Sequence, residues 1–328
     1  MPYMMARRLG LNNEKILQTW LRFDAVHYAK YVAENLVDTE IFHGNSGYSL
    51  APGLLAKRRG AKFICDRSSA HIVMQDRLMR EEGDRMGIII QAIDSHGIET
   101  ELAEYESCDR VFVPSKFAAR TFVEMGVSKE KLWTIPFGVS LGNWRKIDVK
   151  ADGKFRIIFL GSLSLRKGIH DLIAAFRLAA IPNSELILIG SHVSETQQLL
   201  ASARTATNIT VTGPLSHNSV LEWFSRGSVF VLPSIEDGFG IVLLEAQACG
   251  LPVIATTNTG GPDVIENGYN GYIVPIRSPE VIAARLQELY GQPELVRTMS
   301  RAALKITGDA EGWSSFARTI SSKYRELL

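Results

Sequence analysis

The stretch PSIEDGFGIVLLEAQACGLPVIAT, residues 233–256, decides the fold. An apolar strand ends just before it, and a loop follows in which two glycines flank Phe239. A helix then runs to about Cys249, and another apolar strand begins after Gly250. Glu245 lies about one turn into that helix among apolar neighbours, where a carboxylate is costly to bury unless it is paired or binds a ligand. The pattern therefore predicts a strand–loop–helix unit that carries a ligand site.

The same alternation of strand and helix continues on both sides of this stretch. The predicted strands are short, continuous apolar runs, which is typical of strands buried on both faces of a parallel sheet. They are Glu40–His43, Lys62–Asp66, Arg110–Val113, Leu132–Ile135, Phe155–Leu160, Glu185–Ile189, Asn208–Val211, Val229–Leu232, Pro252–Ala255 and Gly271–Val274. The predicted helices include Ile169–Ala179, Ser219–Arg226, Val242–Ala248 and Pro279–Tyr290, and the glycines predicted to cap helices are Gly60, Gly126, Gly227 and Gly250. We expect an α/β fold with doubly wound domains.

The length of 328 residues predicts two domains, because single cores stop growing near ~250–300 residues. The alternation breaks over residues 138–153, where glycine, proline and charged residues gather before a new strand begins at Lys154. We therefore place an N-terminal domain at residues 1–145 and a C-terminal domain at residues 146–312. Residues 313–328 are predicted to form a terminal helix.

A second strand–turn–helix unit, FLGSLSLRKGIHDLIAAF, spans residues 159–176. Its turn begins at Gly161, and Arg166 and Lys167 lie where the chain enters the helix. Free N–H groups at a helix start, together with two adjacent cations, favour a phosphate. The alternative is an ordinary turn with a solvated Arg-Lys pair. The spacing matches neither the dinucleotide fingerprint nor the P-loop, so those two nucleotide-binding classes are not supported.

Both loops follow strands of one predicted parallel sheet, so we expect them at the same edge, where such sheets bind ligands. The glycines around Phe239 allow a ligand to approach the backbone closely. Asp237 is suited to sugar hydroxyls, and Glu245 is suited to the paired hydroxyls of a ribose. Alternatively, both acids are charges favoured by the helix dipole, which accounts for Asp237 better than for Glu245.

In these motifs the chain resembles the retaining glycosyltransferases of the family 4 type, or glycosyl transferases group 1, which have the GT-B fold. The resemblance covers residues 155–328 and, more weakly, 39–140. It implies two doubly wound Rossmann-like domains facing a cleft, with a terminal helix that crosses back to the N-terminal domain. The implied reaction moves a sugar from a nucleotide-diphosphate donor to a hydroxyl of a sugar, glycan or lipid-linked acceptor, with retention of configuration. No cofactor is implied, and no Asp-x-Asp pair suggests a bound metal.

The resemblance also assigns roles to individual residues. Asp237 and Glu245 have the family's spacing of two acids separated by seven residues, although the first acid is usually glutamate, and Glu236 stands beside Asp237. Asp237 is assigned to catalysis and Glu245 to the ribose. The further donor-binding residues are Gly161, Arg166, Lys167, Gly238, Phe239, Gly240, Ile241 and Val242, and Pro214 and Leu215 are placed near the base. Ser162 departs from the family, which often has arginine there.

His71 closes the segment CDRSSAH (65–71), which begins at the end of a predicted strand. Family members often have a histidine here that reaches the donor sugar, so the resemblance assigns His71 to catalysis. The alternative is a structural histidine with its hydrogen bonds satisfied. His43 is a weaker candidate, and residues 104–122 match a family pattern expected to serve the fold and the cleft wall.

The start of the chain, MPYMMARRLGLNNEK, contains none of the strand, Gly-rich loop and helix with which the family opens. We therefore expect an N-terminal domain that lacks its first strand and Gly-rich loop. One rival function is a non-catalytic nucleotide-sugar-binding protein or a degenerate partner subunit. Another is a nucleotide-sugar epimerase or a sugar phosphorylase of similar shape, although the spacing of Asp237 and Glu245 favours transfer.

Composition bears on partners and location. The net charge is +1, with 36 basic and 35 acidic residues, so nucleic acid is not an expected partner. Three widely spaced cysteines without a CxxC motif predict a reducing compartment, with neither disulfides nor a zinc cluster. No apolar run reaches the length of a bilayer span, so we expect a cytoplasmic protein. The basic residues Lys57, Arg58, Arg59 and Lys62 are either solvated or a peripheral contact with the inner membrane face.

Overall fold

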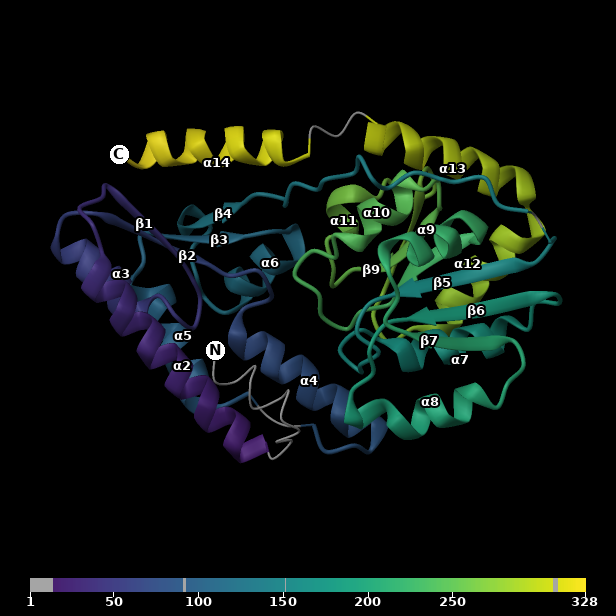
Figure 1. Cartoon of the computed structure of the whole chain (residues 1–328), viewed down its shortest axis with the longest axis horizontal. Coiled ribbons are helices and arrows are strands. Elements are labelled where there is room, and N and C mark those ends of the chain that lie inside the picture. Colours follow the sequence, from purple (N-terminus) through teal and green to yellow (C-terminus); the bar gives the residue numbers. More distant parts are fainter. Residues whose placement is uncertain (1–13, 91–92, 151, 309–311) are drawn as a thin grey trace.

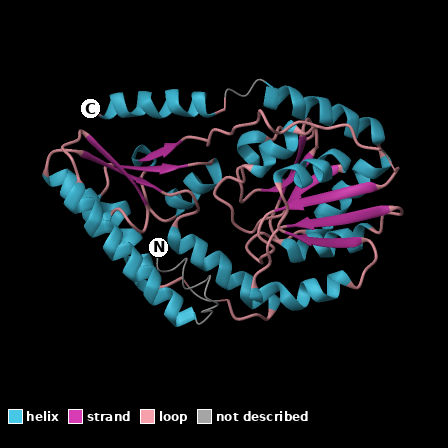
Figure 2. Cartoon of the chain, viewed as in Figure 1, coloured by secondary structure: helices cyan, strands magenta, loops and turns pink. Residues whose placement is uncertain are grey.

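Two parallel sheets form the framework of the computed structural model, which describes residues 14–90, 93–150, 152–308 and 312–328. Figure 1 shows the two sheets side by side, and Figure 2 shows helices packed around each of them. We call the part built on the smaller sheet the N-terminal domain and the part built on the larger sheet the C-terminal domain. Residues 1–13, in the segment where we expected no strand or Gly-rich loop, lie outside the described residues.

The smaller sheet has the strand order β1-β2-β3-β4, and each neighbouring pair is parallel. Its strands are β1 Ile41–Asn45, β2 Lys62–Asp66, β3 Arg110–Val113 and β4 Leu132–Thr134. Its helices are α2 Glu14–Asn35, α3 Leu50–Arg58, α4 Ile72–Met86, α5 Ser95–Ser107 and α6 Lys116–Glu124. Phe63, Val111 and Phe122 form part of the apolar core between this sheet and its helices.

The larger sheet has the order β10-β9-β8-β5-β6-β7, again with parallel neighbours. Its strands are β5 Phe155–Leu160, β6 Ser184–Ile189, β7 Ile209–Gly213, β8 Val229–Leu232, β9 Val253–Thr256 and β10 Gly271–Val274. Its helices are α7 Ile169–Ala179, α8 Gln197–Arg204, α9 His217–Arg226, α10 Val242–Ala248, α11 Gly261–Val264, α12 Pro279–Gly291 and α13 Pro293–Gly308. Strands β8 and β9 are buried along their whole length, as strands covered on both faces should be.

All ten predicted strands are present, within two residues at each end, and the four predicted helices are confirmed with similar accuracy. Gly60, Gly126 and Gly250 adopt the left-handed backbone expected of residues that end helices. Gly227 is also confirmed as a helix C-cap, that of α9, but its backbone is extended rather than left-handed. A side chain there would meet Ile158 at 2.8 Å, so close packing requires the glycine.

The strand order places the carboxyl ends of β5 and β8 next to each other. From β5 the chain continues to β6 and β7 on one side, and it then returns to β8, β9 and β10 on the other side. The reversal makes the β5/β8 edge a topological switch point, where the helices that follow the two strands diverge. The two loops singled out by the sequence, 161–168 and 233–241, both begin at this edge.

Helix α14, Trp313–Leu327, lies along the smaller sheet although it follows the C-terminal domain in sequence (Figure 1). Its Ile320 packs in an apolar cluster with Phe112, Trp133 and Ile135. The hydroxyl oxygen of Tyr324 lies 2.6 Å from the Nδ1 atom of His43, within hydrogen-bond distance. At the other boundary Trp144 packs on Phe224 of the C-terminal domain, with the two ring centroids 5.6 Å apart. The limits at residues 145 and 312 stay predictions.

Helix α4 connects the domains through a buried cluster of charges. Glu82 has no exposed side-chain surface, and it receives hydrogen bonds from Arg85 and from Arg277 of the C-terminal domain, the latter at 2.7 Å. His170 Nε2 lies 2.6 Å from Glu82, and Asp171 accepts from Arg85 at 2.7 Å. Burial raises the pKa of Glu82, but the hydrogen bonds from His170, Arg85 and Arg277 outweigh it and lower the pKa to about 2.

Two predictions about the surface can be compared with the structure. Lys57 donates to the Ser107 carbonyl oxygen and Arg59 donates to that of Leu36, so two of the four basic residues have partners within the protein. Among the described residues, no helix combines the length and the apolar character needed to cross a membrane. The peripheral membrane contact and the cytoplasmic location stay predictions.

The docking of α14 can be tested at Ile320. Replacing this buried side chain in Ile320→Ala should lower the free energy of unfolding by about 2–4 kcal/mol, because it leaves a cavity against Trp133 and Ile135. Urea unfolding measures the loss, and Ser321→Ala, at the exposed neighbouring position, is the control. Equal stability of the two variants would contradict the docking.

Candidate functional site

The loops after β5 and β8 are joined through their backbones. Ile235 N donates to the Arg166 carbonyl oxygen at 2.9 Å. Gly168 has a φ of +69°, and a side chain there would come within 2.0 Å of the Pro233 carbonyl oxygen, so glycine is required. On its other side the first loop lies against the residue that follows β6, since a side chain on Gly190 would meet the Gly161 carbonyl oxygen at 1.9 Å. These contacts fix Arg166 and Lys167 relative to the second loop.

The two cations of the first loop face two acids of the second. Lys167 Nζ pairs with Asp237 Oδ2, and both side chains are largely buried. Arg166 Nη1 donates to Glu236 Oε2 at 3.1 Å and to the Glu236 carbonyl oxygen at 3.2 Å. The structure therefore brings together three of the residues predicted from sequence, Arg166, Lys167 and Asp237. The pairing of Lys167 with Asp237 and of Arg166 with Glu236 also satisfies the requirement that buried charges have partners.

Glu236 is the functional candidate that sequence reasoning missed. Its carboxylate is fully buried, and it accepts hydrogen bonds from Ser69 and Ala70 of the N-terminal domain as well as from Arg166. Burial raises the pKa of this group, but the Arg166 charge and the hydrogen bonds from Ser69 and Ala70 outweigh it and hold the pKa below its ordinary value. The available signal was a second acid next to Asp237, directly after a buried strand.

The segment Gly238–Phe239–Gly240 lies against the N-terminal domain. A side chain on Gly238 would come within 1.9 Å of the Ser68 carbonyl oxygen, so its backbone touches that segment. The Phe239 ring is buried and meets Phe137 edge to face, at 5.8 Å between centroids. Phe239 is thus the one residue of the three with a side chain, and that side chain is used for packing; the predicted contact of the backbone with a donor sugar stays a prediction.

The first turn of α10 follows directly. Leu243 N and Leu244 N donate to the carbonyl oxygens of Gly240 and Ile241. Ile241 and Val242 lie at the start of the helix, where backbone N–H groups have no acceptor within the helix itself. Their predicted role toward a diphosphate stays a prediction.

Glu245 on α10 lies near the start of α9. Burial raises the pKa of its carboxyl group, and the charge of His217 acts in the opposite direction. His217 is the first residue of α9, and its ring packs edge to face on Trp144 at 4.5 Å. Pro214 is exposed and Leu215 half-buried in the loop that precedes α9. The predicted ribose residue and the predicted base loop are thus both close to the start of α9.

His71 forms the N-cap of α4. Val73 N donates to its Nδ1 at 3.3 Å, and its ring packs between Tyr105 and Phe122 at 5.0 and 4.9 Å. Burial lowers the pKa of His71 to about 4, and the positive charge of Arg67 adds to the effect. These are the contacts of the structural alternative, while contact with a donor sugar stays a prediction.

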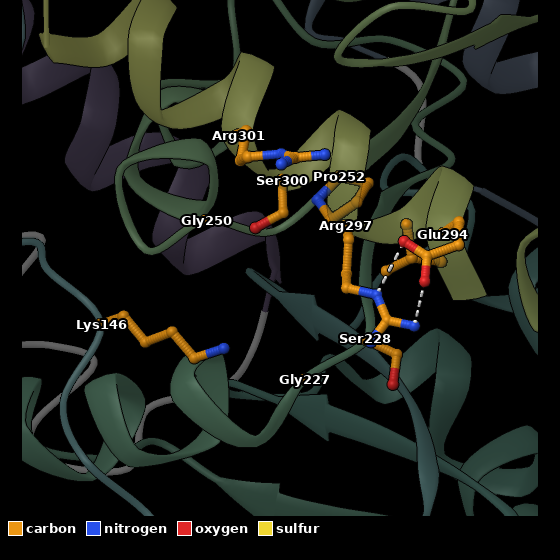
Figure 3. A pocket seen from close by; sticks show the side chains of 10 residues that line it. Lys146, Gly227, Ser228, Gly250, Pro252, Glu294, Arg297, Ser300 and Arg301 are labelled. Atoms are coloured by element: carbon orange, nitrogen blue, oxygen red, sulfur yellow. Dashed lines mark hydrogen bonds and ion pairs between the residues drawn. The ribbon is translucent and has the colours of Figure 1, made fainter.

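Two other features lie apart from this site. A pocket of about 380 Å³ is bounded by Lys146, Ser228, Pro252 and Arg297 (Figure 3). Ser228 and Pro252 precede β8 and β9, so this pocket is at the amino edge of the sheet, opposite the two loops. In the Glu82 cluster, the Arg85 guanidinium lies 2.7 Å from both His170 Nε2 and Asp171 Oδ1, where a metal would have to bind. That cluster therefore carries no metal assignment, and metal independence stays a prediction.

The lowered pKa of His71 predicts a pH-dependent stability. In the unfolded chain this histidine binds a proton near pH 6.5, whereas in the folded protein its pKa is about 4. The unfolded state therefore gains a proton first as the pH falls. The stability that His71 contributes is fully present above pH 6.5 and is lost between pH 6.5 and pH 4. Between pH 7 and pH 4.5 the wild type should lose ~2–3 kcal/mol more than His71→Asn, measured by urea unfolding. His96→Asn, at an exposed position, should keep the wild-type pH dependence, and an unchanged dependence in His71→Asn would contradict the assignment.

The fold and these motifs have counterparts in known proteins. The sequence profile of the family described as Glycosyl transferases group 1 matches residues 142–306, half of the chain. The chain is 29% identical over 230 residues to a D-inositol 3-phosphate glycosyltransferase of Pseudarthrobacter chlorophenolicus, covering 65% of this chain and 54% of the relative. Across three curated relatives, the aligned part spans between 25% and 54% of the relative's length.

Solved structures of low sequence identity share the fold. Sucrose-phosphate synthase from Thermosynechococcus elongatus is similar with a TM-score of 0.76 at 23% identity, over 96% of this chain and 79% of that one. Alr3699/HepE of Anabaena, solved in complex with UDP and glucose, has a TM-score of 0.71 at 16% identity, over 91% of this chain and 81% of that one. Both neighbours share the two parallel sheets of the α/β GT-B fold. The profile match over half of the chain establishes that it belongs to the glycosyl transferases group 1 family.

Proposed function

We propose that the chain transfers a sugar from a nucleotide-diphosphate donor to a hydroxyl acceptor, with retention of configuration and without a metal. The observation that carries the proposal is the pairing of Lys167 with Asp237 and of Arg166 with Glu236 at the β5/β8 switch point. Cations for a diphosphate and a carboxylate for sugar hydroxyls are thereby joined at the edge where α/β sheets bind ligands. Family membership supports the same reaction class.

The proposed donor site divides among three groups of residues. Arg166 uses Nη1 for Glu236, and the remaining N–H groups of its guanidinium are available to a phosphate. Lys167 holds Asp237 Oδ2, so Asp237 Oδ1 is assigned to a hydroxyl of the donor sugar. Glu245 is assigned to the ribose, in agreement with its electrostatic interaction with His217, which follows the loop of Pro214 and Leu215.

The proposed reaction needs no covalent intermediate with the protein. The acceptor oxygen bonds to the anomeric carbon on the face from which the diphosphate leaves, while the bond to the phosphate oxygen breaks. The acceptor proton passes to the leaving phosphate. Arg166 and Lys167 stabilise the charge that develops there, and the rest of the protein contributes position. Because the aligned relatives are D-inositol 3-phosphate glycosyltransferases, that polyol phosphate is the first acceptor to test.

Nucleotide binding is the direct test of the donor site. Thermal unfolding with UDP, GDP, ADP and TDP, each with magnesium or with EDTA, should show one nucleotide that raises the stability by ~2.7 kcal/mol at 100 times its Kd. UDP is tried first, because the Alr3699/HepE neighbour binds it. In Glu245→Gln, most of the stabilisation by this nucleotide should be lost. In Glu222→Gln, which changes an exposed residue on α9, the stabilisation should equal that of the wild type. No shift with any nucleotide would contradict the assignment of the donor site.

Turnover tests the chemistry. Release of nucleoside diphosphate should require both a donor sugar nucleotide and an acceptor, and it should persist in EDTA. Lys167→Ala should lower kcat about 100-fold, because the charge on the departing phosphate then lacks a cation. The anomeric configuration of the product, read by NMR, should equal that of the donor. Inversion would refute retention, loss of activity in EDTA would refute metal independence, and binding without turnover would favour a non-catalytic nucleotide-sugar-binding protein.

A further inference from the structure

The Glu236 carboxylate is shared between the two domains. Its Oε1 atom accepts from Ser69 Oγ at 2.5 Å and from Ala70 N at 3.1 Å. Its Oε2 atom accepts from Gln75 Nε2 at 3.0 Å and from Arg166 Nη1 at 3.1 Å. Three donors thus come from the N-terminal domain and one from the C-terminal domain. A carboxylate without exposed surface depends on all of these partners, so a change at one must alter its bonds to the others.

On one side, this carboxylate reaches the proposed diphosphate site. The Arg166 backbone is fixed through the hydrogen bond from Ile235, while its side chain is partly exposed. Under the proposed function, the guanidinium therefore meets two anions, Glu236 and the diphosphate. When the diphosphate binds, part of the guanidinium's positive charge is directed to it, and the bond to Glu236 weakens.

On the other side, the carboxylate holds the segment 67–71 and the start of α4. Ser69 and Ala70 come directly before His71, the N-cap of α4, and Gln75 lies in the first turn of that helix. The Ser68 carbonyl oxygen meets Gly238 in the same region. If Glu236 turns from Arg166 toward Ser69, Ala70 and Gln75, these groups become more tightly held.

We propose that Glu236 is a positioning residue that transmits binding of a diphosphate at Arg166 to residues 69–75 of the N-terminal domain. This inference rests on the proposed function, because it places the diphosphate at Arg166. It adds a role for an acid outside the predicted pair, Asp237 and Glu245. As a result, binding of the diphosphate at Arg166 and the ordering of residues 69–75 are coupled.

Hydrogen exchange of the full chain tests the transmission. Exchange of peptides covering residues 69–75 is measured with and without UDP, GDP, ADP and TDP, each in turn, and the Kd of each nucleotide is measured in parallel. In the wild type, the nucleotide that binds should slow exchange there by at least about threefold, since the amide of Ala70 is bonded to Glu236. Ser69→Ala should abolish most of this slowing while the Kd changes by no more than about threefold, because the coupling is reciprocal and its size is that of the slowing itself.

The chain offers a matched control. Ser68→Ala removes a neighbouring hydroxyl that donates to Asp66 and is exposed, so its response to nucleotide should equal that of the wild type. Glu236→Gln provides a second variant: its amide cannot accept from donors on both sides, so nucleotide should no longer slow exchange at 69–75.

The outcomes separate the two proposals. Nucleotide binding with equal slowing of exchange in wild type, Ser69→Ala and Ser68→Ala would overturn the role of Glu236 and leave the donor site intact. Binding without any change at residues 69–75 in the wild type would do the same. Failure of every nucleotide to bind the wild type would instead refute the donor site, and the transmission with it.

Discussion

The close contact between Gly168 and the Pro233 carbonyl oxygen is the constraint on which the site depends. It joins the turn after β5 to the loop after β8, two segments that the strand order makes neighbours but that are far apart in sequence. With the hydrogen bond from Ile235 to Arg166, it places two cations opposite two acids before any ligand binds. The strand order places the two loops side by side, and the backbone contact fixes their relative orientation. Attraction between the side chains alone would not fix that orientation.

The resulting site is close to charge balance, because Lys167 pairs with Asp237 and Arg166 with Glu236. Because opposite charges are paired, burying these side chains costs less free energy when no ligand is bound. Under the proposed function, a diphosphate has to compete with two carboxylates for the same cations. The competition favours a ligand that offers more contacts than phosphate alone, and the ribose and the sugar of a nucleotide sugar would provide them through Glu245 and Asp237.

Most of the fold could be predicted, because the information is local. Runs such as Phe155–Leu160 and Val229–Leu232 indicate buried parallel strands wherever they occur, and left-handed glycines such as Gly250 mark helix ends. Gly227 shows the limit, since its small size serves a contact with Ile158 that the sequence does not display. The meeting of Lys167 with Asp237 could be predicted, because their loops follow strands of one parallel sheet and therefore lie at the same edge. Glu236 was missed because its partners Ser69 and Ala70 come from the other domain, and no local pattern connects them.

Helix α4 is held to the C-terminal domain at both ends, near Gln75 by Glu236 and at Glu82 by Arg277 and His170. Its 15 residues extend over ~22 Å, so the two attachments act on a rigid rod rather than at a single point. Helix α4 is thereby attached to the domain of the larger sheet, although in the chain it follows β2 of the smaller one. Separating the sheets must therefore either expose these buried charges or let the four small strands slide over the stationary helix. The second route also breaks the hydrogen bonds from Arg67 to Gln75 and from the Ile93 amide to Asp76, as well as apolar contacts such as those of Ile72, so α4 opposes separation of the sheets by either route.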